Sequence, residues 1–140
     1  MENKELHQSY LLLKIVFGAV PIVAGLDKFF NLLTNWEQYL SPIVKNVVPA
    51  ATFMHVVGVI EIVAGVLVLS KFTRIGAYVV ALWLVGIALN VVTTGHYFDI
   101  AVRDLVMACG AFTLAKLEEV RMRRTVKEPV AARRMEPATA

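Results

Sequence analysis

The chain has 140 residues, of which 58% are hydrophobic and 18% charged, and its formal net charge is +3. An average soluble domain is only about 45–50% apolar even when glycine is counted, so the composition argues against an ordinary water-soluble domain. The single cysteine excludes both a disulfide framework within the chain and a Cys-x-x-Cys redox pair.

Four apolar segments follow one another along the chain, at 10–33, 53–69, 75–95 and 100–117. About 20 helical residues, rising 1.5 Å each, cross the ~30 Å hydrocarbon core of a bilayer. The sequence therefore predicts an all-α fold, an integral membrane four-helix bundle over 10–117. A polar N-terminus (1–9) precedes the bundle, and a basic tail (118–140) follows it, with disorder expected beyond Thr125.

Segment length alone leaves a soluble bundle of buried helices open as an alternative, because the uninterrupted apolar runs cover only 15–26 and 75–89. The first apolar segment follows a polar start and lacks a small-residue cleavage site. We therefore expect this segment to remain attached as a membrane anchor.

The connection between the first two spans contains signals for helix starts. Thr34 followed by Glu37 has the spacing of a capping box, and Ser41 before Pro42 gives an N-cap with proline in the first turn. Aromatic residues of the kind that collect at membrane interfaces lie in the same stretch, Trp36 and Tyr39. We expect a short interfacial helix here, between helices 1 and 2, in the outer headgroup region.

The placement of cationic residues predicts the orientation, because cytoplasmic loops are rich in Lys and Arg. The connection between spans two and three holds Lys71 and Arg74, whereas 94–99 holds none and 31–52 holds only Lys45. The tail contains six cationic residues, Arg121, Arg123, Arg124, Lys127, Arg133 and Arg134. Both termini are therefore expected to be cytoplasmic, with the tail attracted to anionic lipid and not to nucleic acid.

Several spans carry charged residues, although a charge in hydrocarbon costs at least a few kcal/mol and rarely lacks a partner or a task. With the N-terminus inside, all four spans bring polar groups to one level in the outer half of the bilayer. These candidates for a ligand or proton site are Lys28, Glu61, Asn90, Arg103 and Asp104, with Asp27 and His55 as secondary candidates. Asp27 and Lys14 lie near span ends, where a side chain can also snorkel to the interface.

Small residues recur at helical spacing beside these polar groups, which predicts the face that each span turns inward. Spacings of three and four place residues on one helix face, and small residues let membrane helices approach closely. The predicted inward faces are Lys14, Gly18, Pro21, Gly25 and Lys28; Gly58, Glu61 and Gly65; Trp83, Gly86, Asn90 and Thr93; and Asp104, Ala108, Ala111 and Ala115.

Two other interpretations of the polar residues were compared with a ligand site. The opposite charges could simply pair and fix the register of the helices. His55 and His96 are the residues that could ligate a haem iron, and together with Asp99 they could form a divalent metal site. However, His96 lies in a turn, and interfacial polar residues are the simpler interpretation. The sequence predicts no metal site.

Three motifs, GAVPIVAGLDK at 18–28, VGVIEIVAG at 57–65 and YFDIAVRD at 97–104, resemble the DoxX family of small bacterial membrane proteins over about 10–117. The resemblance implies a four-helix bundle, multi-pass in the inner (plasma) membrane. Some relatives are linked to quinone-dependent sulfur oxidation or to redox complexes with soluble partners.

The leading hypothesis is a membrane subunit of a quinone-linked redox complex with a polar pocket in the outer half of the bundle. Lys28 and Arg103 would donate to a quinone head, and Glu61 would exchange a proton. No covalently bound cofactor is implied, so electrons would come from a soluble or membrane oxidoreductase partner, and the chain is not expected to be catalytic alone. A small proton-coupled transporter using Glu61 and a structural scaffold without activity remain alternatives. Self-association is also left open.

Overall fold

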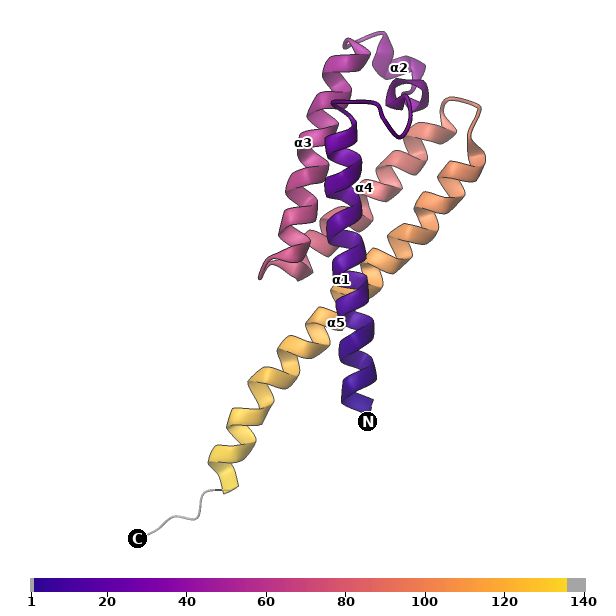
Figure 1. Ribbon diagram of the computed structural model, residues 1–140. Helices are drawn as coiled ribbons and strands as arrows, with labels where there is room; N and C mark the ends of the chain where they lie inside the picture. The colour runs from indigo at the N-terminus through magenta and orange to yellow at the C-terminus, as the bar shows by residue number, and fades with distance from the viewer. Residues whose placement is uncertain (1, 136–140) are drawn as a thin grey trace.

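The computed structural model describes the backbone of residues 2–135 and the side chains of residues 4–126, and its secondary structure is helical throughout (Figure 1). The elements in chain order are α1 (Glu2–Asp27), the 3₁₀ turn η1 (Trp36–Tyr39), the one-turn helix α2 (Pro42–Lys45), α3 (Ala50–Leu69), α4 (Thr73–Val92) and α5 (Phe98–Met135). The fold-class prediction is thus confirmed as far as an all-helical chain.

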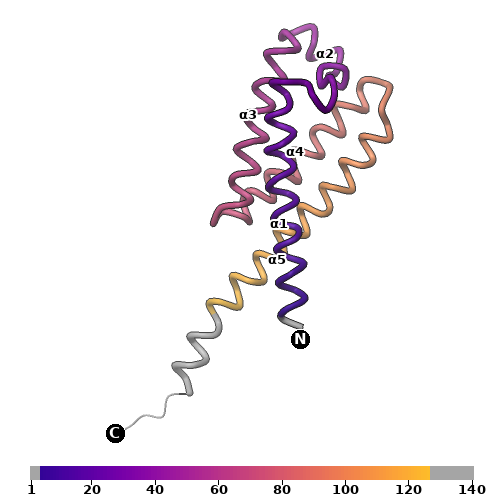
Figure 2. Tube along the Cα trace, in the orientation of Figure 1, coloured from indigo at the N-terminus to yellow at the C-terminus, as the bar shows by residue number. Residues whose placement is uncertain are grey.

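The long helices pack as two pairs, α1 along α3 and α4 along α5, and the pairs meet mainly through α3 and α4. One end of the molecule carries the connection 28–49 and the α4–α5 turn, and we name it the loop end (Figure 2). The opposite end carries the α3–α4 turn, and there the start of α1 and the last part of α5 project beyond that turn. We name this the terminal end.

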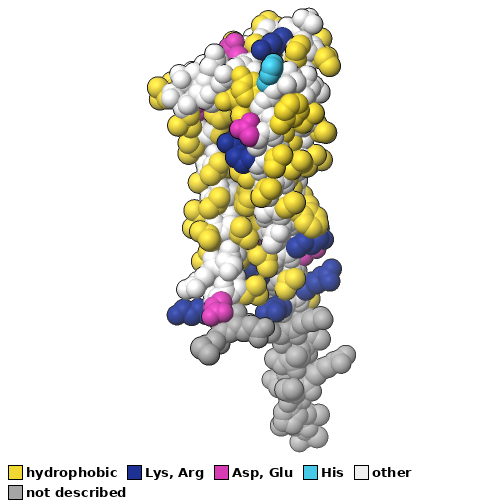
Figure 3. All heavy atoms as spheres, turned by 90° about the vertical axis from the view of Figure 1, so that its right-hand side faces the viewer, with side chains coloured by type: hydrophobic (Ala, Val, Ile, Leu, Met, Phe, Trp, Pro, Cys, Tyr) yellow, Lys and Arg dark blue, Asp and Glu magenta, His cyan; other side chains and the backbone are white. Residues whose placement is uncertain are grey.

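Among the described residues, three helices are long and apolar enough to cross a membrane, namely α1 over Lys4–Asp27, α3 and α4. The helix α5 is not among them, because Arg103, Asp104 and Lys116 interrupt its apolar stretch. Large apolar side chains such as Leu12, Phe30, Leu82 and Val106 are exposed. Figure 3 shows hydrophobic side chains along one face, with cationic ones gathered toward the terminal end. Such a surface fits contact with lipid.

The observed helix bounds differ most from the prediction at the two ends of the chain. The helix α1 begins at Glu2 and therefore includes the polar segment 4–9. The helix α5 begins at Phe98 and continues to Met135, past Thr125, whereas 136–140 lies outside the described residues. At 1.5 Å per residue, the 38 residues of α5 extend about 57 Å, well beyond a ~30 Å hydrocarbon core.

The helix α1 ends at Asp27, six residues earlier than its apolar segment suggests. The amides of Phe30 and Asn31 both donate to the Asp27 carbonyl oxygen, at 2.9 and 2.6 Å. Asn31 has a left-handed backbone with φ of 52°, a conformation that asparagine tolerates better than most residues and that commonly ends helices. The connection therefore starts at Lys28.

The signals in the connection are confirmed in part. The Ser41 side chain caps α2 by accepting from the Ile43 amide, with Pro42 at the first helical position, as predicted. The capping-box prediction is wrong, because Asn35, and not Thr34, caps η1 by accepting from the Glu37 amide at 3.2 Å. Whether this short helix lies in a membrane interface remains a prediction.

Glycines set the contact between α1 and α3, as their spacing predicts. A Cβ atom at Gly25 would collide with the carbonyl oxygen of Gly58, and one at Gly58 with that of Gly25. About two helical turns further along α3, a Cβ at Gly65 would collide with the carbonyl oxygen of Gly18. Backbone thus approaches backbone at two levels, which leaves no room for a side chain at these glycine positions.

The predicted inward face is confirmed for α5 and only in part for α4, where Trp83 and Asn90 make inward contacts whereas Gly86 and Thr93 are exposed. Ala108, Ala111 and Ala115 are buried. On α4, however, Gly86 has open space around it, and the buried residues lie on another face, at Thr73, Gly76, Ala77, Val80, Ala88 and Val91. At the start of α4, a Cβ at Gly76 would collide with the backbone of α3 at Val68, so α4 packs closely on α3 there.

Candidate functional site

A buried ion pair between Lys28 and Glu61 joins α1 to α3. The Lys28 Nζ atom lies 2.6 Å from Oε2 of Glu61, and the two side chains are only 4% and 7% exposed. The close approach of Gly25 and Gly58 brings the two backbones together beside this pair. Two residues that the sequence places at a similar depth are therefore in direct contact.

Both tryptophans of the chain contact this ion pair, each from a different element. The Lys28 ammonium lies 3.8 Å from the ring centroid of Trp36, which belongs to η1. The Trp83 Nε1 atom of α4 donates to Oε1 of Glu61 at 3.4 Å. A cation over an aromatic face and an indole N–H on a carboxylate are both favourable in a desolvated site. The composition of the connection predicted Trp36 at the membrane interface, and its contact with the ion pair was not predicted.

Asp104 is the second buried carboxyl near the pair. Its side chain is 6% exposed and lies 3.6 Å from Nε of Arg103, whereas the Arg103 side chain is 64% exposed. Glu61 and Lys28 lie within electrostatic range of Asp104. Lys28, Glu61 and Asp104 thus carry one positive and two negative formal charges, and Arg103 balances them from the surface. We name these four residues the charged cluster.

Asp27 anchors the connection. Its carboxylate accepts from the amides of Leu32 and Leu33, at 2.9 and 3.1 Å to Oδ1, and from Nε1 of Trp36 at 2.7 Å to Oδ2. Its side chain is buried, so these bonds replace the water that a snorkelling carboxylate would have. The role of Asp27 visible in the fold is therefore to hold 32–36 against the end of α1.

Asn90 holds the other half of the connection. Its side-chain amide donates to the carbonyl oxygen of Tyr39 at 2.8 Å and accepts from the amide of Ser41 at 3.1 Å. Leu40 and Ser41 are buried between these bonds. Both ends of the Asn90 amide are thus engaged by the backbone of the connection, although the sequence groups this residue with the charged ones.

The histidines at the loop end make ring contacts. His55 stacks on Phe29 with centroids 4.9 Å apart and an interplanar angle of 8°. His96 meets Tyr97 edge to face at 6.3 Å. In the part of the chain whose side chains are described, no three His, Cys, Asp or Glu residues are grouped so that they could hold a metal ion.

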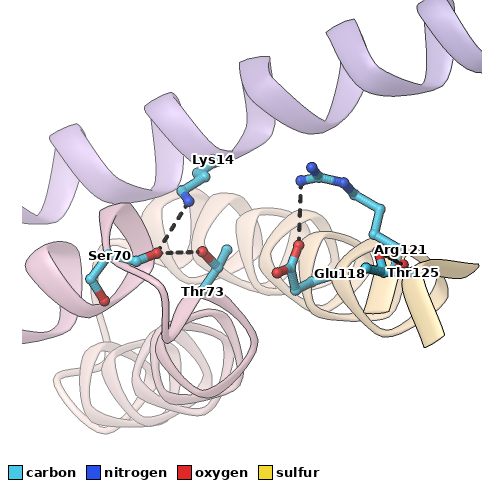
Figure 4. Close-up of polar contacts among 6 residues, drawn as sticks. All are labelled: Lys14, Ser70, Thr73, Glu118, Arg121 and Thr125. Atoms are coloured by element: carbon cyan, nitrogen blue, oxygen red, sulfur yellow. Dashed lines mark hydrogen bonds and ion pairs between the residues drawn. The ribbon is translucent and has the colours of Figure 1, made fainter. Parts of the chain in front are cut away.

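A polar network at the terminal end escaped the sequence analysis (Figure 4). The Lys14 ammonium donates to the Ser70 carbonyl oxygen at 3.1 Å, and the Thr73 hydroxyl donates to the same oxygen at 2.9 Å. Across from them, the Arg121 guanidinium lies 3.8 Å from the Tyr10 ring centroid and 3.5 Å from Glu118. Lys14 therefore caps the end of α3, instead of only snorkelling to the interface.

A second network lies nearby on α4 and α5. Glu119 accepts from the Tyr78 hydroxyl at 2.8 Å and from the Lys116 ammonium at 3.1 Å. These two donors hold the pKa of Glu119 below its usual range, because they stabilise the ionised carboxylate. Charges at this end are thus satisfied by neighbours on the surface, in contrast to the buried charged cluster.

The apolar helices, the exposed hydrophobic surface and the buried ion pair together define a helical membrane protein in contact with the lipid bilayer. The DoxX family model matches residues 9–94, which run from α1 to just past α4. The chain therefore belongs to the DoxX family. No curated protein and no solved structure matches it. The match includes Lys28 and Glu61 and ends before Arg103, so the resemblance of the Arg103–Asp104 segment remains a prediction.

Proposed function

We propose that this DoxX protein is a four-span bundle in the inner membrane with both termini in the cytoplasm. Three points support this proposal: three helices could cross a bilayer, the start of α1 and the last part of α5 project at one end, and Lys71 and Arg74 lie in the turn at that end. The apolar part of α5 would be the fourth span, and the packing of α4 on α5 supports it. The connection with η1 would then face the outer interface.

We further propose that the chain is the membrane subunit of a quinone-linked redox complex. The observation that carries this proposal is the buried Lys28–Glu61 pair with the buried carboxyl of Asp104 beside it. A quinone head has two carbonyl oxygens that accept hydrogen bonds, and Lys28 is a buried donor for one of them. Arg103 would donate from the periphery.

Reduction of a quinone to a quinol takes up two electrons and two protons. Glu61 and Asp104 are carboxyl groups that can carry protons within the bundle. The electrons must come from a partner of the oxidoreductase class, because a chain with one cysteine has no dithiol to oxidise. The role assigned to this chain is therefore to bind the quinone and to deliver protons to it.

Quinone binding by the purified protein in lipid nanodiscs tests this assignment. We expect wild type to bind a short-chain ubiquinone, and we expect Glu61→Gln and Arg103→Ala to weaken binding at least about tenfold, the size of a lost charge-assisted hydrogen bond. Glu119→Gln is a matched control, because it removes a carboxylate from the terminal end only. Equal affinity of wild type, Glu61→Gln and Arg103→Ala would refute the assignment.

Both carboxylate oxygens of Glu61 already have a donor, which favours one alternative function, that of a structural scaffold. Glu61 accepts from Lys28 and from Trp83, so the pair could serve only to fix α1, α3 and α4. On this alternative, Glu61→Gln lowers the melting temperature and quinone binding is absent from wild type as well. Copurification in mild detergent separates the two further, since a redox subunit is expected to bring an oxidoreductase with it.

A further inference from the structure

We infer that the Trp36 indole occupies the place of the ligand ring over Lys28, and that the ligand enters from the loop end by displacing it. This inference rests on the proposed function, because it names how a quinone head reaches the charged cluster. It makes Trp36 a residue that controls access to the site. The connection 29–41 is then the lid that carries this residue, and we name it so below.

The elements that cover the Lys28–Glu61 pair differ in kind. Trp83 covers the pair from α4, and Glu61 itself belongs to α3. The backbone at either residue cannot move away from the pair without unpacking a long helix. Trp36 belongs to η1, a four-residue 3₁₀ turn with no buried residue. Short 3₁₀ turns and connections are the parts of a fold that open at low free energy. Trp36 is therefore the cover that can move while the helices stay packed.

Hydrogen bonds close the lid at two places, and beyond Trp36 the lid also packs through buried Leu40 and through Tyr39, which meets Tyr97 edge to face. The carboxylate of Asp27 holds the Trp36 indole N–H and the amides of Leu32 and Leu33. The side chain of Asn90 holds the lid at Tyr39 and Ser41. The net contribution of each such bond is modest compared with the packing of a long helix, because water can replace the protein partner once the lid opens. Both anchors lie at the loop end, which is also the end where the lid lies in Figure 1.

The chemistry over Lys28 identifies the class of ligand that could replace the indole. The ammonium lies 3.8 Å from the ring centroid of Trp36, so one of its faces is covered by a flat conjugated ring. A quinone head is also a flat conjugated ring, and its carbonyl oxygens can accept from the ammonium, as an indole cannot. Exchange of one ring for the other would need no preformed empty pocket.

Variants at the lid test the exchange through binding. Trp36→Ala removes the competing ring, and we expect it to bind a short-chain ubiquinone about tenfold more tightly, the size of a desolvated cation–π contact. Trp36→Phe keeps a ring over Lys28 and should remain within about twofold of wild type. Asn90→Ala, which loosens the lid away from the ion pair, should tighten binding about threefold. Thr93→Ala is its control, since that hydroxyl bonds only within its own helix.

Hydrogen exchange gives a second measurement that does not depend on activity. When the ubiquinone is added to wild type, the amides of Leu32, Leu33 and Ser41 should exchange at least about fivefold faster, whereas the amides of α3 should stay protected. The lid would be refuted if wild type binds in a Glu61-dependent way, while Trp36→Ala and Asn90→Ala bind no more tightly and the lid amides stay protected. Failure of wild type to bind any quinone would overturn the proposed function, and this inference with it.

Discussion

At the scale of single residues, the Lys28–Glu61 pair illustrates how a charge can be held inside a membrane protein. Each ion is costly to remove from water, and the mutual attraction offsets that cost only when geometry and hydrogen bonding are good. Here the separation is 2.6 Å, and Trp36 and Trp83 contact the outer sides of the two groups. We therefore expect the two ions to be strongly coupled.

A double-mutant cycle measures this coupling. We expect Lys28→Met to lower the free energy of unfolding by about 3–5 kcal/mol, because Glu61 is left buried without a counter-ion. The double variant Lys28→Met/Glu61→Leu should recover most of that loss, since no unpaired charge remains. Unfolding in detergent followed by circular dichroism provides the measurement. If the losses of unfolding free energy in Lys28→Met and in Glu61→Leu alone add up to the loss in the double variant, the ions are not coupled.

The residues of the candidate site differ in how far the sequence could predict them. Lys28 and Glu61 could be matched in depth, because both follow from counting along apolar helices whose orientation the cationic residues predict. The anchoring roles of Asp27 and Asn90 could not, since they depend on a connection that folds back over the loop end. Trp36 was assigned to the interface for the same reason, because composition does not reveal which way a loop ring points.

At the scale of helices, small residues decide which pairs touch. Gly18, Gly25, Gly58 and Gly65 bring α1 and α3 together, and alanines line the buried face of α5. The sequence predicts these contact faces because each row of glycines shares its helix face with a polar group at helical spacing. On α4 the prediction holds for Trp83 and Asn90, which make inward contacts, and fails for Gly86, which has open space around it. Spacing alone does not distinguish a glycine in contact from a glycine facing outward.

Two alanine substitutions at glycines test the packing of these helices. Gly58→Ala should lower the free energy of unfolding by about 1–3 kcal/mol, because its Cβ would collide with the backbone of α1 at Gly25. Gly86→Ala is the matched control, with nothing near its Cβ, and should be neutral or stabilising by up to about 1 kcal/mol. Thermal melts of both variants in the same detergent check this. Equal destabilisation by both would contradict the packing described.

At the scale of the whole molecule, the two ends are unequal. The last part of α5 and the start of α1 extend past the α3–α4 turn, whereas the loop end of the described chain offers only the connection 28–49 and the turn 93–97. The sequence suggested this polarity through its cationic residues. It did not suggest the length of α5, because a charged stretch with prolines is typical of disorder as well as of an exposed helix.

The proposed orientation can be measured with single cysteines in a Cys109→Ser background. Lys45→Cys lies in the connection and should react with a membrane-impermeant maleimide in intact cells. Lys71→Cys lies in the α3–α4 turn and should react only after the inner membrane is opened. The reverse pattern of labelling would invert the topology, and with it the side from which a ligand enters.

The inequality of the two ends determines how such a protein could be controlled from outside the cell. Under the proposed orientation, an antibody fragment or a toxin in the extracytoplasmic space would find little besides the peptide that carries Trp36. Any molecule gripping that peptide would hold the indole over Lys28 or draw it away. The surface most open to external ligands and the cover of the buried charges are thus one and the same segment.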